Sequence, residues 1–191
     1  MKNLAFDFSA ANAGPLVLDV ETQYLSDEVP GGWNAVHKFR IALVVTWDQQ
    51  NSLRVWYEDD AQRLLLEAEK FEPIVTFNGE RFDFKVLSAY GPVDVLYRKS
   101  KDMLTLLKTQ LGFRVKLDSV AQATLGRGKI GSGTESVDWW RSGDPAQRQK
   151  VVEYCKKDVE LTRDIYLFAR EHGYLMIEDL KQNKRRVEVS W

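Results

Sequence analysis

Short apolar runs alternate with polar turns in the first half of the chain, a pattern typical of β-strands. Residues 16–22 (LVLDVET), 39–47 (FRIALVVTW) and 52–58 (SLRVWYE) are rich in β-branched and aromatic residues, and the turn-forming DQQN separates the last two. These segments predict a β-meander. Residues 73–78 (PIVTFN) predict a further short strand, whose first residue is a proline at a position where no ladder donor is lost.

Helical spacing of apolar residues begins after the meander. Residues 61–70 and 82–90 predict two helices, the second followed by the helix-ending pair Gly-Pro. Residues 104–112 and 117–126 predict two short helices that each end in glycine. Together with the strands, these helices predict an α/β fold: a mixed β-sheet, with three antiparallel strands and then parallel strands, flanked by α-helices.

The last third of the chain contains the longest helical pattern. Asp144 and Pro145 predict its start, as N-cap and first helical residue, and the pattern continues to about Arg170. The glycine-rich residues 126–138 before it predict a loop. Residues 174–191 predict a C-terminal β-hairpin around the turn KQNK.

Length and composition place the chain among globular proteins. Its 191 residues suffice for one well-packed domain, which we expect over residues 1–191 with a core at about 16–170. No apolar run approaches the ~20 residues of a membrane span, and the first residues lack the pattern of a secretory signal, so no membrane association is expected. The single cysteine, Cys155, excludes an internal disulfide and fits a reducing compartment, most simply the cytoplasm.

Two carboxylates interrupt the most strand-like segment. Asp19 and Glu21 stand two residues apart, so they lie on the same face of the predicted strand, ~6.5–7 Å apart along it. An unpaired buried charge is costly, and this spacing lets both carboxylates reach one hard cation such as Mg²⁺. The alternative is an edge strand with one polar face.

Further acids lie at the next strand–helix junction and in the long helix. Asn78 ends the strand before the junction and Asp83 opens the helix beside Phe82; by itself, Asp83 also fits a helix-start acid that interacts with the helix dipole. Tyr154 lies one turn before Asp158, and alone it fits a core aromatic. Asp158 needs a cation or strong donors, because it belongs to an apolar stripe at positions 151, 155, 158, 162, 165 and 169.

Basic residues gather between positions 98 and 129, although the formal net charge of the chain is −1. The eight are Arg98, Lys99, Lys101, Lys108, Arg114, Lys116, Arg127 and Lys129. The count alone fits a solvated face, whereas beside an acidic centre it would attract the phosphates of nucleic acid. The two acids of the stretch, Asp102 and Asp118, are given no catalytic role, and Asp118 fits the N-cap of a helix that begins near Ser119.

The order of the acidic motifs along the chain is specific. The chain has Asp-x-Glu on the first strand, Asn-x4-Asp at a strand–helix junction and Tyr-x3-Asp on a late helix. This order resembles the tyrosine-bearing branch of the DEDD superfamily of 3′–5′ exonucleases, whose members have a ribonuclease H-like fold. The nearest likeness is to the exonuclease domain of family B DNA polymerases and to small bacterial ribonuclease H-like exonucleases. It runs from about Leu16 to Arg170 and includes the segment KLDSVAQATLG.

The resemblance implies a catalytic role for each matching residue. Asp19, Glu21, Asp83 and Asp158 would hold two divalent ions, Mg²⁺ or Mn²⁺, with Asp19 bridging them. Tyr154 would orient the attacking water rather than remove its proton, since the ordinary pKa of tyrosine is near ~10.

Contacts to the substrate are implied as well. Thr22 would contact the terminal nucleotide, Asn78 the substrate backbone and Phe82 the terminal base, with a core position as the alternative for Phe82. The expected activity is hydrolysis of single-stranded DNA from its 3′ end, as in DNA repair. RNA hydrolysis by the same site stays an alternative, because no residue identifies a reader of the 2′-hydroxyl. A non-catalytic nucleic-acid-binding or scaffold module is the second alternative.

Two segments outside these motifs bear on partners. The loop 26–38 is long enough to cover the site. The chain is either a free-standing nuclease or a subunit, and a protein partner such as a helicase or a polymerase is compatible with both. The C-terminal hairpin is a candidate surface for such a partner or for nucleic acid, through Lys181, Lys184, Arg185 and Arg186.

Overall fold

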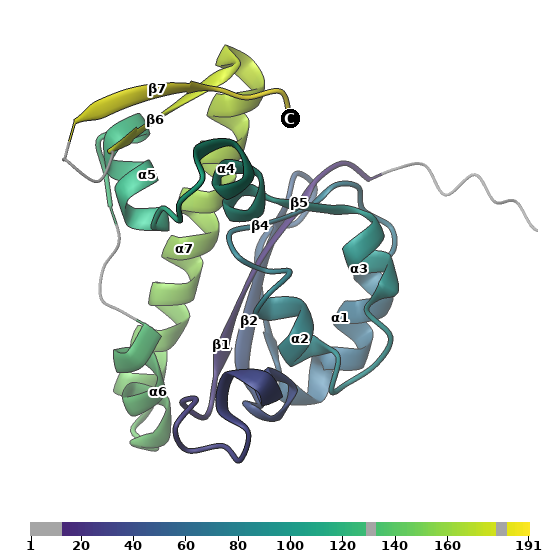
Figure 1. Cartoon of the computed structure of the whole chain (residues 1–191). Helices are drawn as coiled ribbons and strands as arrows, with labels where there is room; N and C mark the ends of the chain where they lie inside the picture. Colours follow the sequence, from purple (N-terminus) through teal and green to yellow (C-terminus); the bar gives the residue numbers. More distant parts are fainter. Residues whose placement is uncertain (1–12, 129–132, 179–182) are drawn as a thin grey trace, which may run out of the picture.

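The computed structural model of the chain describes residues 13–128, 133–178 and 183–191. Its larger sheet has five strands in the order β3–β2–β1–β4–β5 (Figure 1). The first three strands pair antiparallel, whereas β4 and β5 run parallel to β1. The mixed sheet predicted from the sequence is therefore confirmed, with strands at β1 (Leu16–Thr22), β2 (Ile41–Asp48), β3 (Ser52–Tyr57), β4 (Ile74–Thr76) and β5 (Ser100–Asp102).

Helices cover both faces of this sheet (Figure 1). One face carries α1 (Ala61–Ala68), α2 (Asp83–Leu87) and α3 (Asp94–Arg98). The other carries α4 (Met103–Leu111), α5 (Leu117–Leu125), α6 (Gly133–Arg141) and α7 (Pro145–His172). None of the helices in the described part of the chain combines the length and apolarity that a membrane crossing needs.

Alternation along β1 divides the core into two hydrophobic clusters. Leu16, Leu18 and Val20 pack on the side of α1 and α2, while Val17 packs on the side of α7. Because side chains of a strand alternate between faces, Asp19 and Glu21 follow Val17 toward α7. The strand thus presents its two carboxylates to the longest helix of the fold.

The start of α7 matches the sequence prediction. Asp144 is the N-cap, with its carboxylate accepting a hydrogen bond from the backbone N–H of Ala146 at 3.2 Å, and Pro145 is the first helical residue. The helix ends at His172, two residues later than predicted, before Gly173 with a left-handed φ of 74°. All six positions of the predicted apolar stripe are buried, Asp158 included.

Two local predictions were wrong. The segment 133–138, expected as part of a loop, belongs to α6, whose Ser136 and Val137 are buried by packing on α7 and β1. Tertiary contacts therefore override the weak helical propensity of this glycine-rich stretch. Asp118 is not an N-cap, because α5 begins at Leu117 and Lys116 takes that position. The loop 26–38 contains a 3-10 helix, η1 (Gly32–Lys38).

A second, two-stranded sheet follows α7. Strands β6 (Tyr174–Glu178) and β7 (Lys184–Glu188) pair antiparallel, and β6 packs on α5 and α7. The hydroxyl of Thr124 in α5 donates a hydrogen bond to the carbonyl of Met176 at 2.8 Å. Lys184, Arg185 and Arg186 of β7 are exposed, and Lys181 lies outside the described residues.

Candidate active site

Asp83 is held against β1 because β4 is short. β4 pairs with β1 only at Leu16 and Val17, so the N–H of Val20 has no partner in β4. That N–H instead donates to Oδ1 of Asp83 at 2.9 Å. The start of α2 thereby takes the place of β4 beside Val20 and brings a buried carboxylate close to the acidic pair of β1.

The loop from β4 to α2 is fixed by backbone geometry and by Asp102. Asn78 has a left-handed φ of 81°, which asparagine tolerates better than most residues. A Cβ added to Gly79 would lie 2.5 Å from the side chain of Thr76, so only glycine fits there. The carboxylate of Asp102, which also caps α4, accepts the N–H of Asn78 at 2.9 Å and that of Glu80 at 3.1 Å. Asp102 thus positions the loop that carries Asn78.

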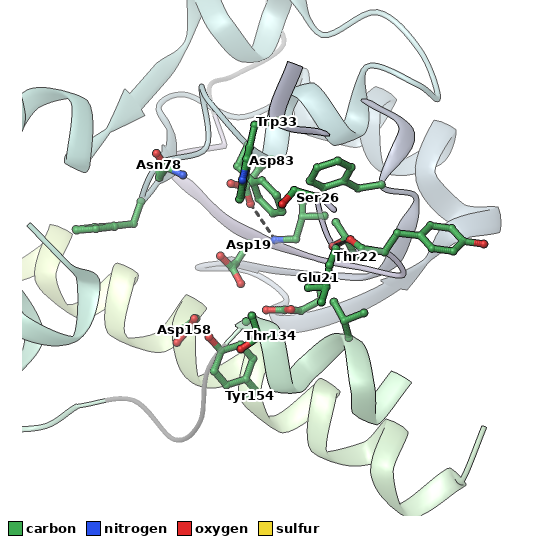
Figure 2. A pocket seen from close by; sticks show the side chains of 18 of the residues that line it. Asp19, Glu21, Thr22, Ser26, Trp33, Asn78, Asp83, Thr134, Tyr154 and Asp158 are labelled. Atoms are coloured by element: carbon green, nitrogen blue, oxygen red, sulfur yellow. Dashed lines mark hydrogen bonds between the residues drawn. The ribbon is translucent and has the colours of Figure 1, made fainter. Parts of the chain in front are cut away.

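A cavity of about 750 Å³ opens at the carboxyl ends of β1 and β4. Figure 2 shows the carboxylates of β1 facing Tyr154 and Asp158 of α7 across it. All eight residues singled out in the sequence line this one cavity: Asp19, Glu21, Thr22, Asn78, Phe82, Asp83, Tyr154 and Asp158. Segments up to 139 residues apart in the chain meet here, as the difference between positions 19 and 158 shows. The individual roles of these residues stay predictions.

Burial and mutual repulsion perturb the groups of the cavity. The pKa of Asp83 is raised well above its ordinary value, first by burial and then by the negative charge of Asp19. Burial, followed by the charges of Asp158, Glu21 and Asp19, also raises the pKa of Tyr154. The tyrosine therefore keeps its proton at neutral pH and is a hydrogen-bond donor rather than a base.

Ligand atoms for a cation converge between β1 and α7. One ligand atom each of Asp19, Glu21 and Cys155 lies within 4.8 Å of the others, and Sγ of Cys155 is 3.4 Å from Oδ2 of Asp19. Carboxylate oxygens suit hard divalent cations. A cation would also relieve the repulsion that raises the pKa of Asp83, so the donor set fits a divalent metal. Asp83 and Asp158 line the same cavity outside this tight group.

Three features of the cavity escaped the sequence reasoning. Ser136 of α6 donates a hydrogen bond to Oε2 of Glu21; it fell in a predicted loop. Trp33 is 67% exposed, and its ring centroid lies 5.8 Å from that of Phe39 and 6.2 Å from that of the half-buried Phe82. No pattern in the loop 26–38 indicates such a contact. Cys155 occupies the predicted apolar stripe, and that pattern does not indicate its contact with Asp19.

Part of the basic stretch 98–129 adjoins the cavity of about 750 Å³ that the carboxylates line, which we name the acidic cavity. A guanidinium nitrogen of Arg114 donates to Oδ1 of Asn78 at 2.9 Å. Arg114 and Lys116 line a second hollow of about 680 Å³, which shares Asp19, Asn78 and Tyr154 with the first. A positive wall therefore borders the acidic centre.

Other residues of the stretch lie elsewhere, so only part of it fits the phosphate-attracting flank that was one of its two interpretations. Arg98, Lys99 and Lys101 stand at the start of β5, at the opposite end of the sheet from the acids. Arg127 is engaged by Asp164 of α7, and Lys129 lies outside the described residues. The basic residues are separated because of the direction of β5: residues before a strand lie at one end of the sheet, and residues after it lie at the other.

Comparisons with known proteins agree on the fold. A search of curated proteins found no match. Among solved structures, the family B DNA polymerase of the hyperthermophilic archaeon Pyrobaculum calidifontis is similar with a TM-score of 0.59 and 18% identity, covering 82% of this chain and 24% of the polymerase chain. RNase D of Trypanosoma brucei is similar with a TM-score of 0.57 and 16% identity, covering 84% of this chain and 58% of the other. The chain thus spans only part of the length of both.

A family model matches the sequence over most of the chain. The model of the RNase H superfamily matches residues 16–169, from the first residue of β1 almost to the end of α7. This range contains every candidate residue of the acidic cavity, and it confirms the predicted ribonuclease H-like fold. The chain belongs to the RNase H superfamily.

Proposed function

We propose that the chain is a divalent-metal-dependent 3′–5′ exonuclease that hydrolyses the phosphodiester bonds of single-stranded DNA. The observation that carries this proposal is the meeting of four carboxylates and Tyr154, from β1, α2 and α7, in one cavity. Solved structures with the same fold belong to a DNA polymerase and to an RNase, which supports nucleic acid as the substrate.

Each carboxylate would hold a cation from the strand or helix that carries it. Asp19 and Glu21 would hold cations from β1, Asp158 from α7 and Asp83 from α2. Two divalent ions, Mg²⁺ or Mn²⁺, would acidify the attacking water and offset the charge of the scissile phosphodiester. Ser136 keeps the carboxylate of Glu21 oriented through its hydrogen bond.

Tyr154 would act as a donor to the attacking water. Its raised pKa keeps the hydroxyl protonated, so it can orient the water by its O–H but cannot take the proton. The activity should therefore need a cation to produce the nucleophile, rather than a side-chain base.

The surroundings of the carboxylates suit the end of a single strand. Trp33 and Phe82 offer aromatic faces on which an unpaired base can stack, and Thr22 lies in the same cavity for contact with the terminal nucleotide. On the other side, Arg114 and Lys116 would attract the phosphates. Asn78, held by Arg114, lies between the two regions.

The test is digestion of a 5′-labelled single-stranded DNA and of its RNA counterpart, with Mg²⁺, Mn²⁺ or EDTA. The variants are Asp19→Ala and Asp158→Ala, and Asp59→Ala at an exposed position outside the cavity is the matched control. We expect a ladder shortened from the 3′ end that requires metal, persists in the control and disappears in both cavity variants.

Other outcomes would redirect the proposal. Preferential cleavage of the RNA would support the same site with RNA as substrate. Cleavage of neither strand by folded, metal-loaded protein would overturn the exonuclease and favour a module that only binds nucleic acid.

A further inference from the structure

A third cavity lies at the end of the sheet opposite the acids. It measures about 580 Å³ and opens at the starts of β1, β4 and β5. We name it the basic cavity, after four of the residues that line it: Arg98, Lys99, Lys101 and Arg170. In Figure 1 the start of β1 and the C-terminal residue lie toward one end of the molecule, and α6, which borders the acidic cavity, lies at the other.

The acidic side chain that lines the basic cavity balances only part of its positive charge. Among the described residues, Arg98, Lys101 and Arg170 form no ion pair, and Glu72 is the acidic side chain of the lining. Lys99 donates to a backbone carbonyl, that of Glu69, at 2.7 Å rather than to a carboxylate. Other arginines of this protein, such as Arg40, are paired with carboxylates.

Polar and aromatic groups complete the lining. The hydroxyl of Ser100 is buried and has no hydrogen-bond partner among the described residues, and such groups call for a ligand or a water. The half-buried Trp191 adds aromatic surface, and the guanidinium of Arg170 lies 5.6 Å from the ring centroid of Tyr166, which is buried. Cations beside aromatic rings are the combination that binds phosphate together with an attached apolar or aromatic group.

We propose that the basic cavity is a second anion site, which binds a phosphate-bearing ligand independently of the acidic cavity. The two lie apart along α7, because Asp158 and Tyr166 are eight residues, or roughly 12 Å, from each other. The phosphate has two possible sources: a free nucleotide, or the backbone of a nucleic-acid strand that crosses the surface. The proposal holds whether or not the acidic cavity is an exonuclease.

EDTA removes the metal-dependent attraction of phosphate to the acidic cavity, and the variant Arg114→Gln/Lys116→Gln measures what the basic residues beside that cavity contribute. We would titrate pyrophosphate, dAMP and an oligo(dT) of about twenty nucleotides into the full chain in EDTA, by calorimetry. The test variant is Arg98→Gln/Lys101→Gln. The matched control, Lys85→Gln/Lys108→Gln, removes the same charge from exposed positions outside the three cavities.

We expect at least ten-fold weaker binding in the test variant, unchanged binding in the control, and full binding in Asp19→Ala. Thermal unfolding of each variant establishes that it is folded. Binding of dAMP and pyrophosphate would assign the cavity to free nucleotides, and binding of the oligonucleotide alone would assign it to a strand. Binding of none of the three ligands, or an equal loss in test variant and control, would overturn the proposal.

Discussion

Replacing Asp83 by asparagine should stabilise the metal-free protein, and the gain should increase with pH. Asp83 is buried with its pKa raised well above the ordinary value, chiefly by burial and then by Asp19. In the folded protein it keeps its proton at pH values where the unfolded chain has lost it. The stability due to this proton is complete below the ordinary pKa of about 4, and it is lost as the pH rises from there to the raised pKa of the folded state.

The size of the effect follows from linkage. Each pH unit in this window lowers the free energy of unfolding by about 1.4 kcal/mol for one proton. Between pH 5 and pH 7 the wild type should therefore lose up to about 3 kcal/mol relative to Asp83→Asn. The asparagine does not titrate, and its amide oxygen can still accept the N–H of Val20.

The assay is urea unfolding in EDTA at pH 5, 6 and 7, with Asp102→Asn as the contrast. Asp102 is equally buried, but its two oxygens accept N–H groups from Asn78, Glu80, Leu104 and Thr105. An amide has a single acceptor oxygen, so this variant should lose about 1–3 kcal/mol of stability through its unmade hydrogen bonds. A loss of stability in Asp83→Asn that does not change with pH would refute the reasoning.

Three further variants test other parts of the site. Tyr154→Phe should lower kcat by about 10²-fold while KM changes little, in steady-state digestion of a labelled strand; an unchanged kcat would remove the tyrosine from the mechanism. Trp33→Ala should raise KM about ten-fold or more, since stacking of one base contributes ~1–3 kcal/mol, and should leave Tm nearly unchanged because Trp33 is 67% exposed. Gly79→Ala should lower Tm by several degrees, because its Cβ would lie 2.5 Å from the side chain of Thr76; an unchanged Tm in thermal unfolding would show that the loop adapts.

Local signals account for what the sequence could predict. Asp144 and Pro145 mark the start of α7 through their own backbone preferences, independent of the rest of the fold. The Asp-x-Glu pair places two carboxylates on one face of β1 by strand geometry alone. Each motif could therefore be read within a few residues, and their order along the chain suggested one site.

What the sequence could not predict depends on contacts between distant segments. Ser136 and Glu21 are 115 residues apart, and their hydrogen bond belongs to a helix that forms only by packing on α7 and β1. The short β4 leaves the N–H of Val20 to Asp83, 63 residues away. The sequence left two interpretations of the basic stretch open, because a count along the chain does not show that β5 places its residues at the two ends of the sheet.

The central claim is that the carboxylates of β1, α2 and α7 form one divalent-cation site. Its most direct test is calorimetric titration of Mn²⁺ into the wild type and Asp19→Asn at neutral pH. The account predicts two ions bound by the wild type and the loss of at least one in the variant, whose fold is verified by thermal unfolding. Absence of binding to the wild type, or the same number of ions in both proteins, would contradict it.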